Sequence, residues 1–358
     1  MPQDSQRRAN TMEELTRKEM VRLLEPHNES ALFAEADLAR SRYCGDEIHL
    51  RGIIEFSNHC RRNCAYCGLV ASNKSLKRYR MTAEEIVEAA KKGAAQGIKT
   101  VVLQSGEDNF YNAQRMCDII RRIKSECDTT VTLSIGERSA PEYKAMREAG
   151  ADRFLLKHET ANRRLFRELH PDDDFDRRTY CLQLLKAMGY QTGSGNIVGL
   201  PGQTIADLVD DVLLCRKLDV DMVGIGPFVP HGETPLAGYS RGSSDLTLRV
   251  LALARIVLKD VHIPATTALA TVDTSGRYKA LQCGANVIMP DITPMKYRKH
   301  YSIYPDRADS LQTPEENIAG IREIAESLGR PISSGYGHTL KRGVRTATEG
   351  GARTGAHI

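Results

Sequence analysis

The sequence lacks the features that mark membrane, secreted and nucleic-acid-binding proteins. It has no run of about 18 apolar residues, so no segment is long enough to cross a membrane as a helix. Its start, MPQDSQRRANTMEEL, has no apolar stretch of the kind found in secretory signals. The net charge of +4, from 50 basic and 46 acidic side chains, is too small to favour nucleic acid as a partner. We therefore expect a cytoplasmic protein that binds neither membranes nor nucleic acid.

The cysteines lack the even number typical of a disulfide framework and the second close pair typical of a zinc module. The chain has nine cysteines, which in a sequence without a signal favours reduced thiols. Three of them, Cys60, Cys64 and Cys67, have the spacing C-x3-C-x2-C, and the next one, Cys117, lies far along the chain. The other six have no metal-like spacing, so we expect them to be small buried side chains.

Short apolar runs alternate with amphipathic helical stretches from His49 onward. Two of the helical stretches begin with capping boxes, Thr82 with Glu85 and Thr204 with Asp207. Apolar strands that alternate with helices predict an α/β fold with a parallel sheet buried on both faces. The number of runs matches a closed (β/α)8 barrel of the TIM type, with a doubly wound open sheet as the alternative. The eight runs are HLRGIIEFSN, TVVLQSG, TVTLSIGE, RFLLKHET, TGSGNIVGL, MVGIGPFV, IPATTALAT and NVIMPDI.

The chain divides into three predicted parts. Residues 1–44 are expected to form an N-terminal helical cap, with two or three short helices between Met12 and about Tyr43. Residues 45–330 are expected to form the barrel. Residues 331–358 are expected to form a flexible C-terminal tail, because the end of the chain is polar, Gly-rich and basic.

Seven of the eight apolar runs end in polar or small residues. In a parallel barrel these carboxyl ends face one mouth, where binding sites are built. Each polar end taken singly is also explained as a helix N-cap. The number of such ends favours a functional mouth.

The three close cysteines follow directly after the first predicted strand. Three thiolates in so short a loop can hold one compact metal centre. A structural zinc site needs four ligands, and His59 is available as a fourth, so zinc remains an alternative. The better interpretation is a 4Fe–4S cluster held by three thiolates, with one iron open to another ligand.

The stretch CRRNCAYC, with Tyr66 before the third cysteine, resembles the motif of radical S-adenosylmethionine (SAM) enzymes. The resemblance implies that the open iron binds the amino and carboxylate groups of SAM. It also implies that the reduced cluster cleaves SAM to methionine and a 5′-deoxyadenosyl radical.

From about Gly45 to Pro305 the chain resembles the HydE family of FeFe-hydrogenase maturases. The resemblance covers strand ends and the loops beyond them, where packing alone would not constrain the residues. The matching stretches include IIEFSNHCRRNCAYCGL, LKRYRMTAEEIVE, VVLQSGED, KHETAN, VGLPGQT, DMVGIGPFVPHGETPLA and CGANVIMPDITP.

The resemblance implies roles for individual residues around SAM. Glu159 is expected to bind the ribose hydroxyls, and Arg178 the SAM carboxylate, with its neighbour Arg177 as the alternative. The other expected SAM contacts are Tyr66, Gln104, Ser134, Gly199 and Pro201. The expected substrate contacts are Lys157, Thr266, Thr267, Met289, Tyr301 and Tyr304.

One feature departs from the family pattern. Some members carry further cysteines after the last barrel strand that hold an accessory cluster, whereas SIYPDRADSLQTPEENIAGI has none. We therefore expect a single 4Fe–4S cluster.

The implied function is assembly of the two-iron part of the hydrogenase active-site cluster. The implied substrate is a cysteine-bound iron complex with carbonyl and cyanide ligands. The implied partners are companion maturases of the HydG and HydF types and a low-potential donor such as ferredoxin or flavodoxin. The alternatives are a radical SAM amino-acid mutase such as methylornithine synthase, a biotin-synthase-like enzyme, and a non-catalytic iron–sulfur scaffold. Biotin synthase would need further cysteine ligands, which are absent.

Overall fold

Parallel strands form the centre of the protein, and they are arranged as a closed barrel. The structure is a computed structural model that describes residues 15–26, 29–308 and 310–341. The six-stranded sheet runs in the order β2-β3-β4-β5-β6-β7, and the three-stranded sheet in the order β1-β9-β8. The strands are β1 (His49–Leu50), β2 (Gly52–Ser57), β3 (Thr100–Ser105), β4 (Thr130–Ser134), β5 (Arg153–Leu155), β6 (Gln191–Val198), β7 (Met222–Pro227), β8 (Pro264–Ala265) and β9 (Val287–Ile288).

Two parallel bridges join the sheets and close the barrel. Ile53 of β2 pairs with Asp291 beyond β9, and Met222 of β7 pairs with His262 before β8. Because β1 and β2 are one strand interrupted only at Arg51, each of the eight predicted apolar runs supplies one position around the barrel. The closed-barrel prediction is confirmed, and the open-sheet alternative is wrong.

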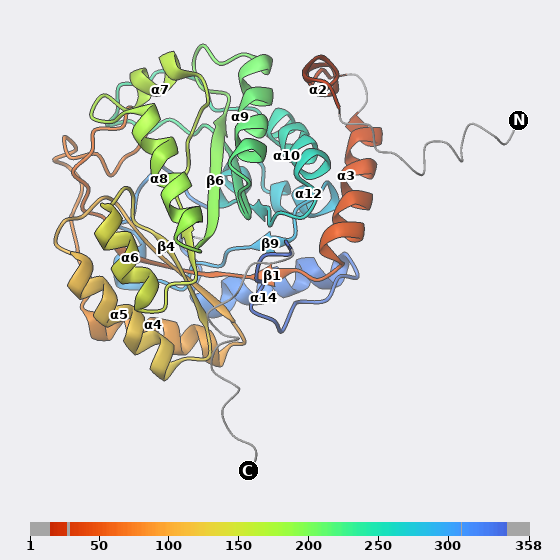
Figure 1. Ribbon diagram of the computed structural model, residues 1–358. Helices are drawn as coiled ribbons and strands as arrows, with labels where there is room; N and C mark the ends of the chain where they lie inside the picture. Colours follow the sequence, from red (N-terminus) through yellow and green to blue (C-terminus); the bar gives the residue numbers. More distant parts are fainter. Residues whose placement is uncertain (1–14, 27–28, 309, 342–358) are drawn as a thin grey trace, which may run out of the picture.

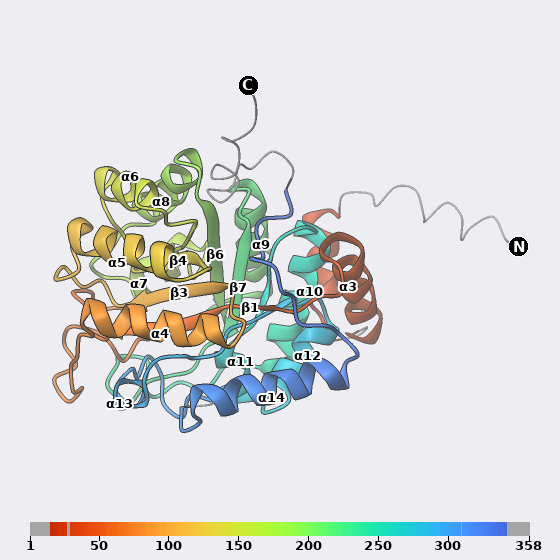
Figure 2. The ribbon, with the colours of Figure 1, turned by 90° about the horizontal axis from the view of Figure 1, so that it is seen from below.

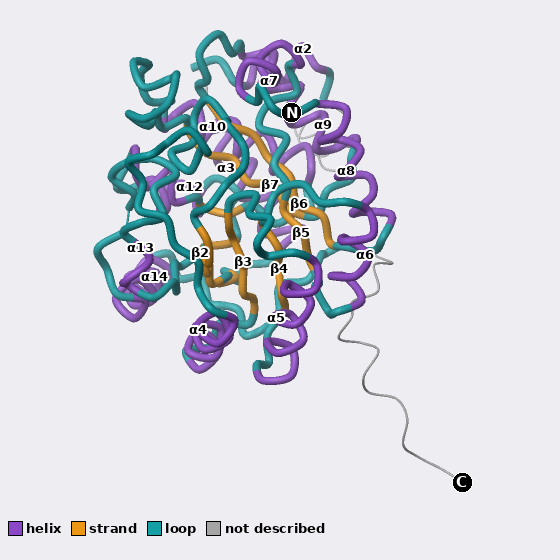
Figure 3. The backbone as a smooth tube through the Cα atoms, turned by 90° about the vertical axis from the view of Figure 1, so that its left-hand side faces the viewer, coloured by secondary structure: helices purple, strands orange, loops and turns teal. Residues whose placement is uncertain are grey.

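Helices form the outer layer around the strands (Figures 1 and 3). Both predicted capping boxes are present, at the start of α4 and of α9. The helices are α2 (Arg17–Leu23), α3 (Glu29–Cys44), α4 (Ala83–Ala95), α5 (Ala113–Glu126), α6 (Ala140–Glu148), α7 (Arg163–Leu169), α8 (Phe175–Ala187), α9 (Ile205–Lys217), α10 (Ser244–Leu258), α11 (Thr267–Val272), α12 (Gly276–Gln282), α13 (Met295–Arg298) and α14 (Pro314–Ser327). No helix in the described ranges has the length and hydropathy that a bilayer crossing demands.

The two faces of the strands differ in chemistry. Residues such as Ile54, Phe56 and Leu103 belong to the large hydrophobic core. The residues between them are polar, such as Glu55 and Ser57, and they are buried as well. Since side chains alternate between the two faces of a strand, the apolar face packs against the helices and the polar face lines the barrel interior. A polar interior suits a ligand better than it suits a packed core.

Both flanking segments pack against the barrel. Helix α3, at the right of Figure 1, lies along α10, and α2 contacts α9 and α10, so the predicted N-terminal helices join the outer layer. The first part of the predicted cap, residues 1–14, lies outside the described residues.

Part of the predicted C-terminal tail is ordered. Ile332 pairs with Ile48 just before β1, and the carbonyl oxygens of Tyr336 and Gly337 accept hydrogen bonds from Arg153 of β5. Residues 331–341 therefore pack against the amino end of the barrel. Their carbonyl oxygens supply the acceptors that the buried guanidinium of Arg153 needs. Figure 2 shows the barrel from below, with α14 alongside α4. The rest of the predicted tail, 342–358, lies outside the described residues.

Candidate active site at the carboxyl end of the barrel

The three cysteines lie in the loop between β2 and α4, at the carboxyl end of the barrel. Arg78 fastens this loop by donating to the carbonyl oxygens of Asn58, Leu69, Val70 and Asn73 over 2.5 to 3.1 Å. One guanidinium thus holds together both ends of the cysteine loop. The fold places the cysteines where sequence analysis predicted a functional mouth.

Neighbouring segments approach the cysteine loop closely enough to exclude larger residues. A Cβ atom on Gly106, which follows β3, would lie 2.6 Å from the Cβ of Cys60. A Cβ atom on Gly68, which follows Cys67, would lie 2.2 Å from the carbonyl oxygen of Ser302. Glycine is therefore required at both positions by close packing.

The three thiols are free and largely withdrawn from solvent. Burial raises the pKa of Cys60 and of Cys64, and it raises the pKa of Cys67 to about 12. Their thiolate forms therefore need a cationic partner, which iron would provide. Within the described residues, no three His, Cys, Asp or Glu side chains converge on one metal ion. A 4Fe–4S cluster places each cysteine on a different iron and does not need such convergence, so this arrangement gives no support to a single zinc ion.

Charged side chains from four loops tie the cysteine loop to the barrel. Arg62 pairs with Glu107 after β3 at 2.7 Å and lies 3.5 Å from Glu137 after β4. Glu137 also accepts from Arg178 at 2.6 Å. Arg178, on α8, pairs in addition with Asp173 and donates to the carbonyl oxygen of Lys157. These contacts connect the cysteine loop, the ends of β3 and β4, and α8.

The two arginines that sequence analysis left open differ in position. The Arg178 side chain is 8% exposed, and its charge acts on the buried Cys64. The Arg177 side chain is 59% exposed, and its Nε donates to the other oxygen of Glu137 over 2.9 Å. Arg178 is thus the inward-facing cation of the two.

Glu159 is held in an unusual backbone conformation beside the cysteines. Its φ of 63° is rare for a residue with a side chain, and it is fixed by backbone bonds to Gly195 and Ile197 of β6. Lys157 Nζ lies 2.8 Å from Glu159 Oε2. Burial alone would raise the pKa of Glu159, but the charge and the hydrogen bond of Lys157, together with the charge of Arg178, outweigh it and lower the pKa. An ionised acceptor is therefore available at the barrel mouth.

Tyr66 connects the cysteine loop to the turn after β6. It packs against a small hydrophobic cluster that includes Leu200, which lies between Gly199 and Pro201. Gly199 has a φ of 87°, and a Cβ atom there would lie 2.7 Å from the Cα of Gly242. The structure therefore brings Tyr66, Gly199 and Pro201 into one region, as predicted for SAM contacts.

His170 is a candidate that sequence analysis missed. It is buried, neither ring nitrogen has a hydrogen-bond partner, and its ring meets that of Tyr66 edge-on at 5.5 Å. Burial, together with Arg178, lowers the pKa of His170 to about 4, so the ring is neutral near pH 7. The fold alone brings it to Tyr66, and the nearest signal in the sequence is its place between two helices, before Pro171. Unpaired nitrogens beside Tyr66 and Glu159 fit a site that receives a polar ligand.

Gln104 and Ser134 lie side by side in the barrel wall. Glu55 of β2 pairs in register with Gln104 of β3, which pairs in register with Ser134 of β4. Tyr301 is 2% exposed, and its hydroxyl bonds the Gln104 side chain. One predicted SAM contact and one predicted substrate contact thus touch each other.

The remaining predicted substrate residues are spread around the mouth. Thr266 caps α11 by accepting from the Leu269 amide, and Thr267 begins that helix. Met289 follows β9, and Tyr304 lies in the segment beyond α13. Thr266 therefore acts as a helix N-cap. The substrate-binding roles of Thr266, Thr267, Met289 and Tyr304 stay predictions.

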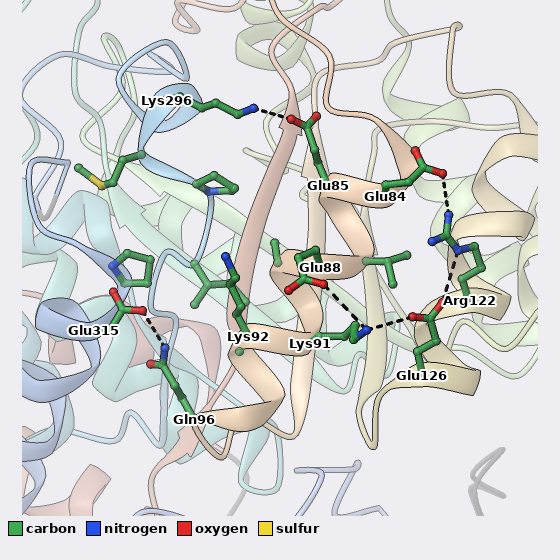
Figure 4. A pocket seen from close by; sticks show the side chains of 17 residues that line it. Glu84, Glu85, Glu88, Lys91, Lys92, Gln96, Arg122, Glu126, Lys296 and Glu315 are labelled. Atoms are coloured by element: carbon green, nitrogen blue, oxygen red, sulfur yellow. Dashed lines mark hydrogen bonds and ion pairs between the residues drawn. The ribbon is translucent and has the colours of Figure 1, made fainter.

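A groove of about 760 Å³ lies elsewhere on the surface (Figure 4). It lies between α4 and residues 292–315, and most of its labelled side chains are paired with one another, such as Lys296 with Glu85 and Gln96 with Glu315. None of the three close cysteines lines it. We therefore place the candidate active site at the barrel mouth.

Comparison with known proteins identifies the family. Residues 54–215 match the model of the radical SAM superfamily. The chain is 51% identical over 332 residues to the FeFe hydrogenase maturase subunit HydE of Thermotoga maritima, which covers 93% of this chain and 94% of the relative. This chain belongs to the HydE family of radical SAM enzymes.

More distant relatives share the fold. A 3-methylornithine synthase of Methanosarcina acetivorans is 28% identical over 303 residues, which covers 83% of this chain and 84% of that protein. The crystal structure of methylornithine synthase (PylB) superposes with a TM-score of 0.79 at 25% identity, over 89% of this chain and 94% of that one. The barrel is thus common to enzymes with different products.

The residues present fit the cofactors that membership of the radical SAM superfamily implies, a 4Fe–4S cluster and SAM. Three half-buried thiols are available for the cluster. An ionised Glu159, the inward-facing Arg178 and an unpaired His170 lie close to them. This set supplies an acceptor for hydroxyls and a donor for a carboxylate, which are the groups that SAM presents.

Proposed function

We propose that this chain is a SAM-cleaving maturase that helps to build the two-iron part of the FeFe-hydrogenase active-site cluster. Its cluster ligands are Cys60, Cys64 and Cys67. The observation that carries the proposal is the 51% identity to a HydE protein over 93% of this chain. Similarity of that extent covers the loops at the barrel mouth as well as the packing positions.

The cluster, when bound, supplies the electron that cleaves SAM to methionine and a 5′-deoxyadenosyl radical. Arg178 binds the SAM carboxylate, since a planar guanidinium matches that group. Glu159 accepts from the ribose hydroxyls, and Tyr66 with the Gly199–Pro201 turn borders the adenine. Gln104 and Ser134 orient the methionyl end.

The substrate is a cysteine-bound iron complex with carbonyl and cyanide ligands, held in the polar barrel interior. Lys157, Thr266, Thr267, Met289, Tyr301 and Tyr304 surround it. A closed barrel excludes water and oxygen from both the radical and the iron complex. A single cluster suffices, because no cysteine is available in 302–321 for a second one.

The partners are maturases of the HydG and HydF types and a low-potential electron donor, ferredoxin or flavodoxin. The protein works in the cytoplasm, where thiols stay reduced.

A cell-free maturation mixture without its own HydE tests this function. We expect active hydrogenase when the reconstituted protein is added, and none with the Cys64→Ala variant. Turnover of an amino acid to methylornithine with no hydrogenase activity would favour the methylornithine synthase alternative, which the TM-score of 0.79 makes the strongest rival.

A second assay separates an enzyme from a scaffold. The reconstituted protein is incubated with dithionite and SAM without oxygen, and 5′-deoxyadenosine is measured. Formation of 5′-deoxyadenosine supports the enzyme. No product after full cluster loading would make the chain a carrier of iron–sulfur units.

A further inference from the structure

The segment 301–308 crosses the carboxyl end of the barrel. Near one end, the carbonyl oxygen of Ile303 accepts from the amide of Gly68, next to Cys67, over 2.9 Å. At the other end, the amide of Ala308 donates to Thr271 Oγ1, at the end of α11, over 2.9 Å. The segment thus connects the cysteine loop after β2 to the end of α11, which follows β8.

A buried ion pair fastens this segment to the barrel wall. Arg307 reaches Glu55 of β2 with two nitrogens, Nη2 to Oε1 at 2.5 Å and Nη1 to Oε2 at 3.0 Å. The Arg307 side chain is 9% exposed and that of Glu55 is 0% exposed. Two-point pairing of this kind fixes direction as well as distance.

The same arginine holds the tyrosines of the segment. Arg307 Nη1 donates to the carbonyl oxygen of Tyr301 over 2.7 Å, and its guanidinium lies 5.6 Å from the centre of the Tyr301 ring. Its side chain also bonds Tyr304. Tyr301 contacts Gln104 of β3, so Arg307 links the barrel wall to the backbone of a residue that itself touches that wall.

We propose that Glu55 and Arg307 are a positioning pair that closes segment 301–308 over the barrel mouth and places Tyr301 and Tyr304 against the substrate. The role in substrate binding rests on the proposed function. The closure itself rests only on the contacts above. Neither residue is among the predicted SAM contacts, so we expect SAM binding to persist when the pair is broken.

The two partners differ in what their loss leaves behind. Glu55→Gln leaves a buried guanidinium that keeps its charge, with Asp291 at 3.8 Å as the remaining carboxylate. Arg307→Gln leaves a buried carboxyl group, which can become neutral by taking a proton. The double variant replaces the ion pair by two amides that can bond each other. We expect Glu55→Gln to open the segment most, Arg307→Gln less, and the double variant least.

The test uses the reconstituted, SAM-loaded holoenzyme without oxygen. Hydrogen exchange of peptides that cover 301–308 measures closure, and the change of the cluster EPR signal on adding SAM measures cofactor binding. The rate of 5′-deoxyadenosine formation against the concentration of a synthetic cysteine-bound iron carbonyl cyanide complex gives KM and kcat. Arg241→Gln is the matched control, because Arg241 pairs with Asp306 of the same segment at 3.3 Å on the surface.

Glu55→Gln is expected to speed exchange in 301–308 at least tenfold, because it leaves a buried guanidinium without its main partner. The EPR response to SAM should persist, KM for the complex should rise more than kcat falls, and the double variant should recover most of the protection. An unchanged exchange rate of 301–308 in Glu55→Gln would overturn the proposal. So would an increase in Arg241→Gln as large as that in Glu55→Gln.

If Glu55→Gln loses both the EPR response to SAM and the protection of 301–308 from exchange, the pair has a general structural role, and this too would overturn the proposal. A complex that does not stimulate the wild type would refute the proposed function, while the exchange data would still decide the closure.

Discussion

Arg178 donates from Nε to Glu137 Oε1 over 2.6 Å, and this bond links α8 to the loop after β4. Arg178 also bonds Asp173 and the carbonyl oxygen of Lys157. Each of its three nitrogens therefore makes one hydrogen bond before any cofactor arrives. Two of the five N–H groups remain for a SAM carboxylate, one on each terminal nitrogen.

Arg178→Gln should weaken SAM binding roughly ten- to a hundredfold, because one or two charge-assisted hydrogen bonds are lost. Glu137 keeps Arg62 and Arg177 nearby, so the loop should stay folded. Titration of the cluster EPR signal with SAM measures the effect. Arg177→Gln is the control. If SAM binding weakens equally in this exposed variant, the assignment of the SAM carboxylate to Arg178 is wrong.

Arg78→Lys should lower the iron and sulfide content of reconstituted protein by at least half. A lysine ammonium has only three donors on a single nitrogen and cannot reach the four carbonyl groups that Arg78 holds. Iron and sulfide are measured in the wild type and in Arg78→Lys after identical reconstitution. Lys77→Gln, at the exposed neighbouring position, is the control. Full loading of Arg78→Lys would show that the cysteine loop is held by other contacts.

Acid should destabilise the amino end of the barrel through His49. Burial, helped by Arg51, lowers the pKa of His49 from about 6.5 to about 4. A histidine with a lowered folded pKa contributes its full stability above pH 6.5 and loses it as the pH falls towards 4. Between pH 7 and pH 5 the loss from this residue is roughly 2 kcal/mol. Urea unfolding of apo protein at both pH values should show a smaller loss for His49→Phe, and an identical loss would refute the assignment.

The ordered end of the chain should be needed for stability. A protein that stops after residue 334 removes the Tyr336 and Gly337 carbonyl oxygens, which accept from Arg153 at 2.7 and 2.9 Å. Arg153 is fully buried, so losing these acceptors should cost roughly 3 kcal/mol. A protein that stops after residue 341 keeps every contact described here and serves as the control. Equal unfolding free energies of the two proteins would contradict the role of residues 335–341.

Local signals in the sequence predicted the barrel well. The capping boxes at Thr82 and Thr204 depend on neighbours three residues apart, and both are present. The alternation of strands and helices also depends on short-range patterns. The closure between Met222 and His262 joins strands through a single bridge, which no local pattern encodes.

Long-range pairing explains what the sequence did not predict. His170 became a candidate only because the fold sets it against Tyr66. Arg307 and Glu55 are far apart in the chain, and each reads singly as an ordinary charged residue. Residues 331–341 look like a tail by composition, but their backbone oxygens meet the buried Arg153. The composition of a segment indicates whether its side chains prefer water. It gives no information on whether the backbone oxygens of that segment accept hydrogen bonds from a distant buried side chain such as Arg153.

EPR spectroscopy of anaerobically reconstituted protein, reduced with and without SAM, tests the central claim most directly. If Cys60, Cys64 and Cys67 hold four irons with one open position, the reduced protein shows a 4Fe–4S signal that changes when SAM is added, and Cys64→Ala abolishes it. The account is contradicted if fully loaded protein gives no such signal, or if the same three cysteines bind zinc tightly instead.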